Sequence, residues 1–465
     1  MKLRLQEIFG LVRDYFYVAL IAVLVLSAVF GLLYYAGRKT VLKGKKPIPK
    51  KRLIAIAAFI GYMIMVAGVT FLNRGPGYQG GVDLSLFSTY REAWYLFSVR
   101  HWQFIYLNIL MLVPFGVLLP LLHPRFRKAA WTIGLAALLT LSIETIQLIT
   151  GYGNFVADDL FNNLMGAIIG YGLTMGVISL KEKGFRRSLP YFTPLMLVAV
   201  LSGSLFGYYE AKEFGNLSIV PAHRADLKEA RVMADLSFSD RSKTIPVYRA
   251  PVYTKKQADG FARRFFGRLG GNPADIEDLS YPDEALYRLH GETAYQLSVR
   301  FRDGSYELTD FSQLDDGKEP EDTDEETLRE SLVRFGLEIP RDAAFQRAGP
   351  GKYEWTVKQL ESGNRLTDGT LTAVYYNDGT VKQLDNRLVT YEKVKEVRVK
   401  SEQEAYEDLL KGKFLTFSDE RTIGALEVRD VRMSYSLDSK GYYQPVYAFR
   451  CEVDGEDKTL LVPAI

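Results

Sequence analysis

The 465-residue chain is nearly neutral as a whole, with 58 Lys and Arg residues against 55 Asp and Glu residues, but its two halves differ sharply. Residues 1–209 carry 21 basic and 8 acidic side chains, a net charge of +13, and contain the long apolar runs. Residues 210–465 carry 37 and 47, a net charge of −10. The single cysteine, Cys451, excludes an intrachain disulfide framework. We therefore expect a membrane-embedded first half and a water-exposed second half.

Six segments of the first half are long and apolar enough to cross a bilayer, which takes about 20 helical residues. The first is too long for a secretory signal peptide and lacks a small-residue cleavage site. The sequence thus predicts a bundle of six transmembrane helices within residues 1–209. The spans are expected near residues 15–36, 53–72, 102–122, 129–150, 158–179 and 190–209.

The loops between the spans predict an orientation. Loop 37–52 has eight Lys and Arg residues and no acid, and loops 123–128 and 180–189 are also basic. These three loops fall on one side of the bundle, which the positive-inside rule places in the cytoplasm. The N-terminus and everything after residue 209 are then extracytoplasmic. Placement of the basic runs between alternate spans also argues against nucleic acid as a partner.

Polar side chains recur at one depth in three of the spans. Asn108, Glu144 and Asn163 each lie five or six residues from the outer end of a span, roughly 7–9 Å below the surface. A carboxylate in hydrocarbon is costly, so such groups face a bundle interior or a wet cavity. We expect an outward-facing polar pocket. The alternative is that these groups only bond to one another and lock the helices together.

Helical spacing adds neighbours to this cluster and indicates close packing. Gln147 shares a helix face with Glu144, and Asp159 shares one with Asn162 and Asn163. Asp158 has a simpler interpretation, because acids commonly cap helix N-termini. None of the four histidines is expected in the polar cluster. Small residues four apart predict close helix contacts, and Pro114 predicts a kink. The small-residue pairs are Gly166 with Gly170 and Gly203 with Gly207.

Residues 53–180 resemble the VanZ-like membrane family. The similarity follows LNILMLVPFGVLLPLL, then SIETIQ, then DDLFNNLMG. Gly153 and Val156 stand where the family usually has Arg and Asp. The resemblance implies a bacterial cell-envelope protein, and the founding member is associated with resistance to the glycopeptide teicoplanin. The family positions are Arg74, Asn108, Pro114, Phe115, Gly116, Glu144, Gln147, Asp158, Asp159, Asn163 and Gly166.

The second half predicts an α+β region of about three repeated modules, each a helix followed by antiparallel strands. Asp-Gly pairs begin at residues 303, 378 and 454, spaced 75 and 76 apart, between alternating strand patterns. Ser401 with Glu404 forms a helix-start signature, and Gly270 and Gly336 mark helix ends. We expect a connector at 210–253 and modules at 254–323, 324–400 and 401–465.

The second half carries no catalytic signature. No GxSxG, P-loop or HExxH motif occurs, and His290 has no metal-ligand spacing around it. We expect no metal and no cofactor. Residues 254–465 are instead expected to bind an envelope protein partner.

The leading hypothesis is an outward pocket that binds a membrane lipid or a lipid-linked or amphipathic cell-wall precursor. Two alternatives stay open: acid–base chemistry on an envelope lipid, with Glu144 and Asp159 as candidate catalytic groups, and a membrane-anchored sensor or scaffold. Pro114, Gly116, Gly166 and Gly170 are expected to be structural. The expected ligand-binding residues are Arg74, Asn108, Glu144, Gln147, Asp158, Asp159 and Asn163.

Overall fold

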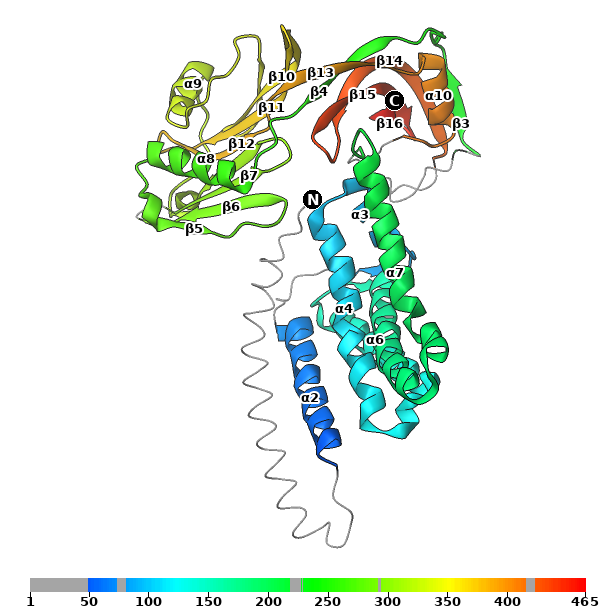
Figure 1. The fold of residues 1–465 in the computed structure, drawn as a ribbon. Helices are drawn as coiled ribbons and strands as arrows, with labels where there is room; N and C mark the ends of the chain where they lie inside the picture. Colours follow the sequence, from blue (N-terminus) through cyan, green and yellow to red (C-terminus); the bar gives the residue numbers. More distant parts are fainter. Residues whose placement is uncertain (1–48, 73–80, 218–226, 228, 292–293, 415–422) are drawn as a thin grey trace. The chain divides into compact units, whose positions relative to one another are not determined.

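The computed structural model in Figure 1 describes residues 49–72, 81–217, 227, 229–291, 294–414 and 423–465. The described residues form two compact units. The helical unit holds residues up to Ala93 and from His101 to Lys212, and the sheet unit holds Trp94–Arg100 and Glu213–Ile465. The expected span at 15–36 and the candidate Arg74 lie outside the described residues.

Five helices among the described residues are long and apolar enough to cross a membrane. They confirm the second to sixth predicted spans, and most extend a few residues beyond the predicted bounds. The first, α2, continues through a short π-helix. The helices and short turns of this part of the chain are α2 (Lys50–Ala67), η1 (Gly68–Leu72), α3 (Ser88–Leu96), α4 (Val99–Leu122), η2 (Pro124–Arg127), α5 (Ala129–Thr150), α6 (Ala157–Lys183) and α7 (Phe185–Ala211).

The helical unit is held together by an unusually close approach of α4 and α6. A Cβ atom placed on Gly166 would lie 1.8 Å from the carbonyl oxygen of Ile109, and one on Gly170 would lie 2.0 Å from that of Val113. From the opposite side, a Cβ on Gly116 would lie 2.1 Å from the carbonyl oxygen of Ala167. No side chain fits at such distances, so only glycine permits these backbones to touch.

Helix α7 packs differently from the prediction. Gly203 and Gly207 have no atom within 4 Å of an added Cβ, so the expectation that they bring helices together is wrong for the described residues. Small residues at this spacing are common in membrane helices and do not by themselves fix a contact. The close contact lies instead at Gly172 of α6, where a Cβ would be 2.1 Å from the carbonyl oxygen of Tyr191.

The segments between the second and third spans and between the fourth and fifth spans contain regular structure. Strand β1 (Val82–Asp83) pairs in parallel with β2 (Phe155–Val156), and α3 follows β1. The segment before α4 is therefore joined to the segment before α6 by backbone hydrogen bonds. Two-residue strands and a nine-residue helix are too short to give a clear periodic signal in the sequence.

The sheet unit is built on one extensive, mostly antiparallel sheet (Figure 1). Its main strand order is β3-β14-β15-β4-β13-β11-β12-β8-β7-β6-β5, with β10 on β11, β9 on β10 and β16 on β15. Three helices accompany it: α8 (Lys255–Arg268), α9 (Glu325–Val333) and α10 (Glu402–Leu410). The strands are β3 (Arg231–Ala234), β4 (Thr244–Arg249), β5 (Ile276–Asp278), β6 (Glu284–Leu289), β7 (Tyr295–Arg300), β8 (Tyr306–Asp310), β9 (Ala344–Gly349), β10 (Lys352–Ser362), β11 (Arg365–Tyr375), β12 (Val381–Asn386), β13 (Val389–Arg398), β14 (Ala425–Leu437), β15 (Tyr442–Val453) and β16 (Glu456–Pro463).

The two largest apolar cores in the described part of this unit each pack helices against strands. One contains Phe265 and Phe266 of α8, Leu328 of α9 and Trp355 of β10, and so joins α8 and α9 to shared strands. The other packs α10 against β14, β15 and β16 and includes the buried Cys451. The first core draws side chains from both of the expected ranges 254–323 and 324–400.

The predicted turn and cap signals of this half are confirmed locally. Gly304, Gly379 and Gly455 each have a positive φ in the turn that joins two paired strands. Gly270 and Gly336 also have positive φ, and they follow the C-terminal ends of α8 and α9 respectively. Ser401 and Glu404 form the predicted capping box at the start of α10. Short-range chemistry thus specifies these element ends.

We predict that Gly166→Ala will lower the thermal unfolding midpoint of the detergent-purified protein by several degrees, because the new methyl group must push α4 away from α6. Gly203→Ala on α7 is the matched control and should leave the midpoint unchanged, since open space surrounds it. Equal midpoints for the two variants would show that α4 and α6 do not touch at Gly166.

Candidate functional site

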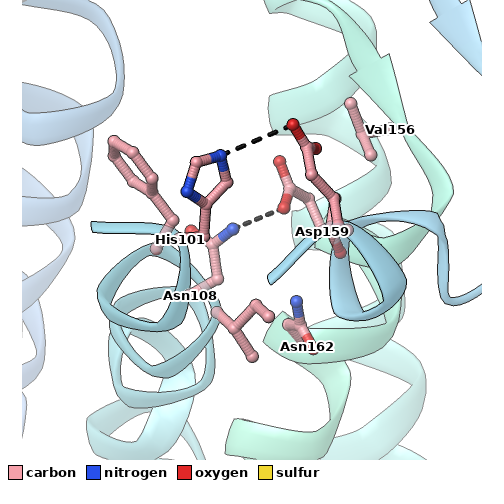
Figure 2. A pocket seen from close by; sticks show the side chains of 9 residues that line it. His101, Asn108, Val156, Asp159 and Asn162 are labelled. Atoms are coloured by element: carbon pink, nitrogen blue, oxygen red, sulfur yellow. Dashed lines mark hydrogen bonds and ion pairs between the residues drawn. The ribbon is translucent and has the colours of Figure 1, made fainter. Parts of the chain in front are cut away.

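A cavity of about 240 Å³ opens among α3, α4, α6 and the end of β2 in the helical unit. Each helix contributes residues from one face. Spacings of three and four residues place His101, Ile105 and Asn108 together on α4. Figure 2 shows these side chains converging from the separate elements. The lining residues are Thr89, Glu92, His101, Phe104, Ile105, Asn108, Val156, Asp159 and Asn162.

Two polar pairs lie next to each other in the cavity (Figure 2). Asn108 of α4 donates from Nδ2 to Oδ1 of Asp159 on α6. His101 Nε2 lies 3.4 Å from Oε1 of Glu92 on α3. The hydrogen bond with His101 lowers the pKa of Glu92, although partial burial opposes this effect. The two pairs connect α4 to α6 and α4 to α3.

Asn162 is oriented by a contact behind the cavity. Its Oδ1 accepts a hydrogen bond from the hydroxyl of Tyr90. Burial, with smaller contributions from the charges of Asp158 and Asp159, raises the pKa of Tyr90 to about 12, so the phenol stays protonated and donates at neutral pH. The Nδ2 group of Asn162 is directed toward the Asn108–Asp159 pair (Figure 2). The cavity therefore presents an amide donor beside a carboxylate acceptor.

Asp158 does not line the cavity, but it holds the start of α3, one of the helices that do. It is fully buried, and it accepts hydrogen bonds from the backbone N–H of Phe87 at 2.5 Å and of Thr89 at 2.9 Å, and from the Thr89 hydroxyl at 2.6 Å. These are groups at the start of α3, so Asp158 caps a helix other than its own. The contact also holds Phe87 at φ 63°, a left-handed conformation that a bulky residue rarely adopts.

The other predicted site residues on α5 and α6 are buried outside this lining. Glu144 Oε2 lies 3.4 Å from the backbone N–H of Val156, and Gln147 Nε2 donates to the carbonyl oxygen of Thr70 at 3.2 Å. Asn163 Nδ2 donates to Thr140 Oγ1 at 3.0 Å. Their contacts join α5 to β2, to η1 and to α6. The structure thus brings Asn108 and Asp159 into one cavity and places Glu144, Gln147 and Asn163 in the bundle interior.

The sequence analysis missed five lining residues: Thr89, Glu92, His101, Phe104 and Ile105. The expectation that no histidine belongs to the membrane cluster is wrong, because His101 lines the cavity with Asn108. Thr89 and Glu92 lie on α3, between the second and third predicted spans, where no helix was predicted. The seven-residue spacing of His101 and Asn108 was the available signal, since it places both on one helix face.

Within the described ranges, no three or more His, Cys, Asp or Glu side chains are arranged to hold a metal ion.

This geometry defines the class of protein. It is a multi-pass membrane protein with five candidate spans in its described part and a polar cavity among its helices. More particularly, residues 59–179 match the family model VanZ/LLP1, so this part of the chain is a VanZ/LLP1 family domain, followed by a C-terminal α+β region. Among curated proteins no match is found.

Among solved structures, the chain is similar to the Bacillus megaterium YpeB C-terminal domain. The identity is 12%, and the alignment covers 46% of this chain and 93% of that one, with a TM-score of 0.23.

We predict that Asp158→Ala will speed hydrogen exchange of the α3 backbone amides by up to about thirtyfold, because loss of a helix cap costs about 0.5–2 kcal/mol. Exchange is measured by mass spectrometry on peptides that cover residues 81–98. Ser142→Ala, an exposed position whose hydroxyl bonds only within α5, is the control. Unchanged protection of α3 in Asp158→Ala would contradict the capping role.

Proposed function

We propose that the helical unit binds the polar head of an amphipathic envelope molecule in the cavity, while the apolar part lies along α4. The observation that supports this proposal is the position of Phe104. Its side chain lines the polar cavity, yet it is 57% exposed. It therefore belongs both to the cavity and to the outer apolar surface of the bundle.

That outer surface continues along α4. Leu107 is 40% exposed and Leu110 is 58% exposed, and with Phe104 they follow the helix at three-residue intervals. Exposed leucines of a membrane helix face acyl chains. A ligand with its head group at Asn108 and Asp159 and its tail on this stripe would match polar to polar and apolar to apolar.

The narrower proposal names the ligand as a cell-wall molecule. A lipid-linked or amphipathic wall precursor has a sugar-bearing head and an apolar tail, and amides and carboxylates suit the hydroxyl groups of such a head. Holding this molecule would keep a glycopeptide of the teicoplanin type from its target, which would give resistance. Asn108, Asp159 and Asn162 would make the polar contacts.

The cavity also supports a second candidate, acid–base chemistry on an envelope lipid. The observation that favours it is the His101–Glu92 pair, since a histidine held by a carboxylate can act as a general base. In this candidate His101 takes the role that the sequence analysis assigned to Glu144, because Glu144 lies outside the cavity lining.

We expect purified wild-type protein to retain a bound amphiphile in native mass spectrometry, and Asn108→Ala with Asp159→Ala to lose most of it. The variants remove the pair at the centre of the cavity, whereas Ser142→Ala on the far face of α5 should retain the ligand. Retention by the double variant would refute the binding proposal. A lipid in the cells that is chemically altered only when His101 is present would favour the enzyme candidate.

We propose that the sheet unit binds another envelope protein. We also propose that its three helices with their strands are copies of one module. The repeat is supported by the matching positions of α8, α9 and α10, each followed by a hairpin with an Asp-Gly turn. If the chain serves only as a sensor or scaffold, the sheet unit will keep its role when the cavity residues are replaced.

We propose six spans with the N-terminus and the sheet unit outside the cell. With Cys451 replaced by Ala, a membrane-impermeant maleimide should label Leu314→Cys in intact cells and label Lys128→Cys only after the cells are opened. Both positions are exposed. The reverse labelling pattern would invert the proposed topology.

A further inference from the structure

We propose that the sheet unit carries a carbohydrate-binding site on the face of strands β6, β7 and β8 that points away from its apolar core. The ligand is a hydroxyl-rich sugar chain, one ring of which lies in a recess of that face. This site is separate from the membrane cavity, and it does not depend on the function proposed for that cavity.

The recess is a cavity of about 220 Å³ in the sheet unit. Pockets for drug-sized ligands measure about 300–1,000 Å³, so this one suits a single ring-sized group. Its lining comes from three strands that pair in the order β6, β7, β8. The lining residues are Glu284, Leu286, Gln296, Ser298, Glu307 and Thr309.

The polar character of this face follows from the alternation of side chains along each strand. Ala285, Leu297 and Leu308 are buried in the core that these strands share with α8 and α9. Their neighbours in sequence therefore point to the opposite face of the sheet. The polar face is thus a fixed consequence of strand register, and it rests on a rigid apolar core.

The lining offers the hydrogen-bonding groups that a sugar needs. Ser298 donates from Oγ to Oε1 of Glu284, which orients that carboxylate. Glu307 is exposed and Thr309 is partly buried, so a ligand can reach both. Carboxylates accept hydrogen bonds, and hydroxyl groups both donate and accept, as sugar hydroxyls do. Leu286 adds one apolar contact for the C–H face of a ring.

The polar surface continues beyond the recess, which favours a chain over a single sugar. Arg288 pairs with Gln296, Gln296 with Thr309, and Thr309 with the exposed Gln383 of β12. Neighbouring strands lie about 4.8 Å apart, so this row crosses roughly 14 Å of the sheet. That distance is longer than one sugar ring.

Charges of both signs lie side by side on this face. Arg288 donates from Nη2 to Oε1 of Gln296 at 3.4 Å, and Arg300 lies opposite Glu284 in the ladder. Burial raises the pKa of Glu284, and the nearby positive charge of Arg300 opposes this effect. A strongly acidic or strongly basic partner would meet like charges here, whereas an uncharged sugar would not.

The strands of this face are poorly suited to a polypeptide ligand. Peptides that bind sheets usually add a strand at an exposed edge. Here β6 lies between β5 and β7, β7 lies between β6 and β8, and β8 lies between β7 and β12. Protein interfaces also centre on aromatic and apolar anchors, and among the described lining residues Leu286 alone is aliphatic. An envelope protein partner would therefore bind elsewhere on the unit.

The test uses three uncharged probes: chitotetraose, cellotetraose and a five-residue peptide of serine, asparagine and threonine. Each is titrated into the full-length protein in phosphatidylcholine nanodiscs, and binding is measured by saturation-transfer difference NMR. We expect at least one sugar to bind with a Kd of about 1 mM or tighter, and the peptide to bind at least about tenfold more weakly. Binding of chitotetraose alone indicates an N-acetylated sugar, and binding of both indicates that hydroxyl groups suffice.

Two variants locate the binding. Glu307→Ala and Thr309→Val should each weaken sugar binding at least about threefold, because each removes a hydrogen-bonding group. Glu392→Ala, an exposed glutamate on β13 of the same sheet, is the matched control and should bind as the wild type does. Failure of both sugars to bind overturns the proposal, as does full binding by both variants. Peptide binding as tight as sugar binding would identify the recess as a polypeptide site instead.

Discussion

The helical unit depends on the contact between the backbones of α4 and α6. Glycines at 116, 166 and 170 let the helices approach more closely than any side chain would permit. At this separation the short amide of Asn108 can reach the short carboxylate of Asp159. Polar groups within a membrane must be satisfied by the protein itself. Close packing and polar pairing are therefore one constraint, because each sets the geometry that the other needs.

The cavity exists because a third helix is held against this pair. Asp158 caps α3 from within α6, and the strand pair β1–β2 ties the two preceding segments together. Helix α3 then brings Glu92 to His101. Adjacent residues of α6 thus have separate roles: Asp158 positions an element, and Asp159 contacts the cavity. On α5, by contrast, Glu144 and Gln147 both position neighbouring segments, because each is bonded to a backbone group there.

Hydropathy could predict the second to sixth spans, and helical spacing could group their polar residues by helix face, since both follow from local sequence. They could not show that Asn108 and Asp159 line the cavity whereas Glu144 and Asn163 lie elsewhere in the bundle interior. That distinction depends on how each helix is rotated, and nearly uniform apolar helices give little sign of rotation. Helix α3 was missed because nine residues carry little periodic signal. In the sheet unit, Asp-Gly turns and caps are local, whereas the pairing of β8 with β12 joins distant segments that no turn specifies.

The most direct test of the Asn108–Asp159 contact is a double-mutant cycle. It measures the thermal stability of purified Asn108→Ala, Asp159→Ala and the double variant. If the two side chains bond across the α4–α6 contact, the losses will be non-additive by about 1 kcal/mol, within the range found for hydrogen bonds between membrane helices. Losses that add to within about 0.3 kcal/mol would show that the two residues are independent. The cavity as described would then not exist.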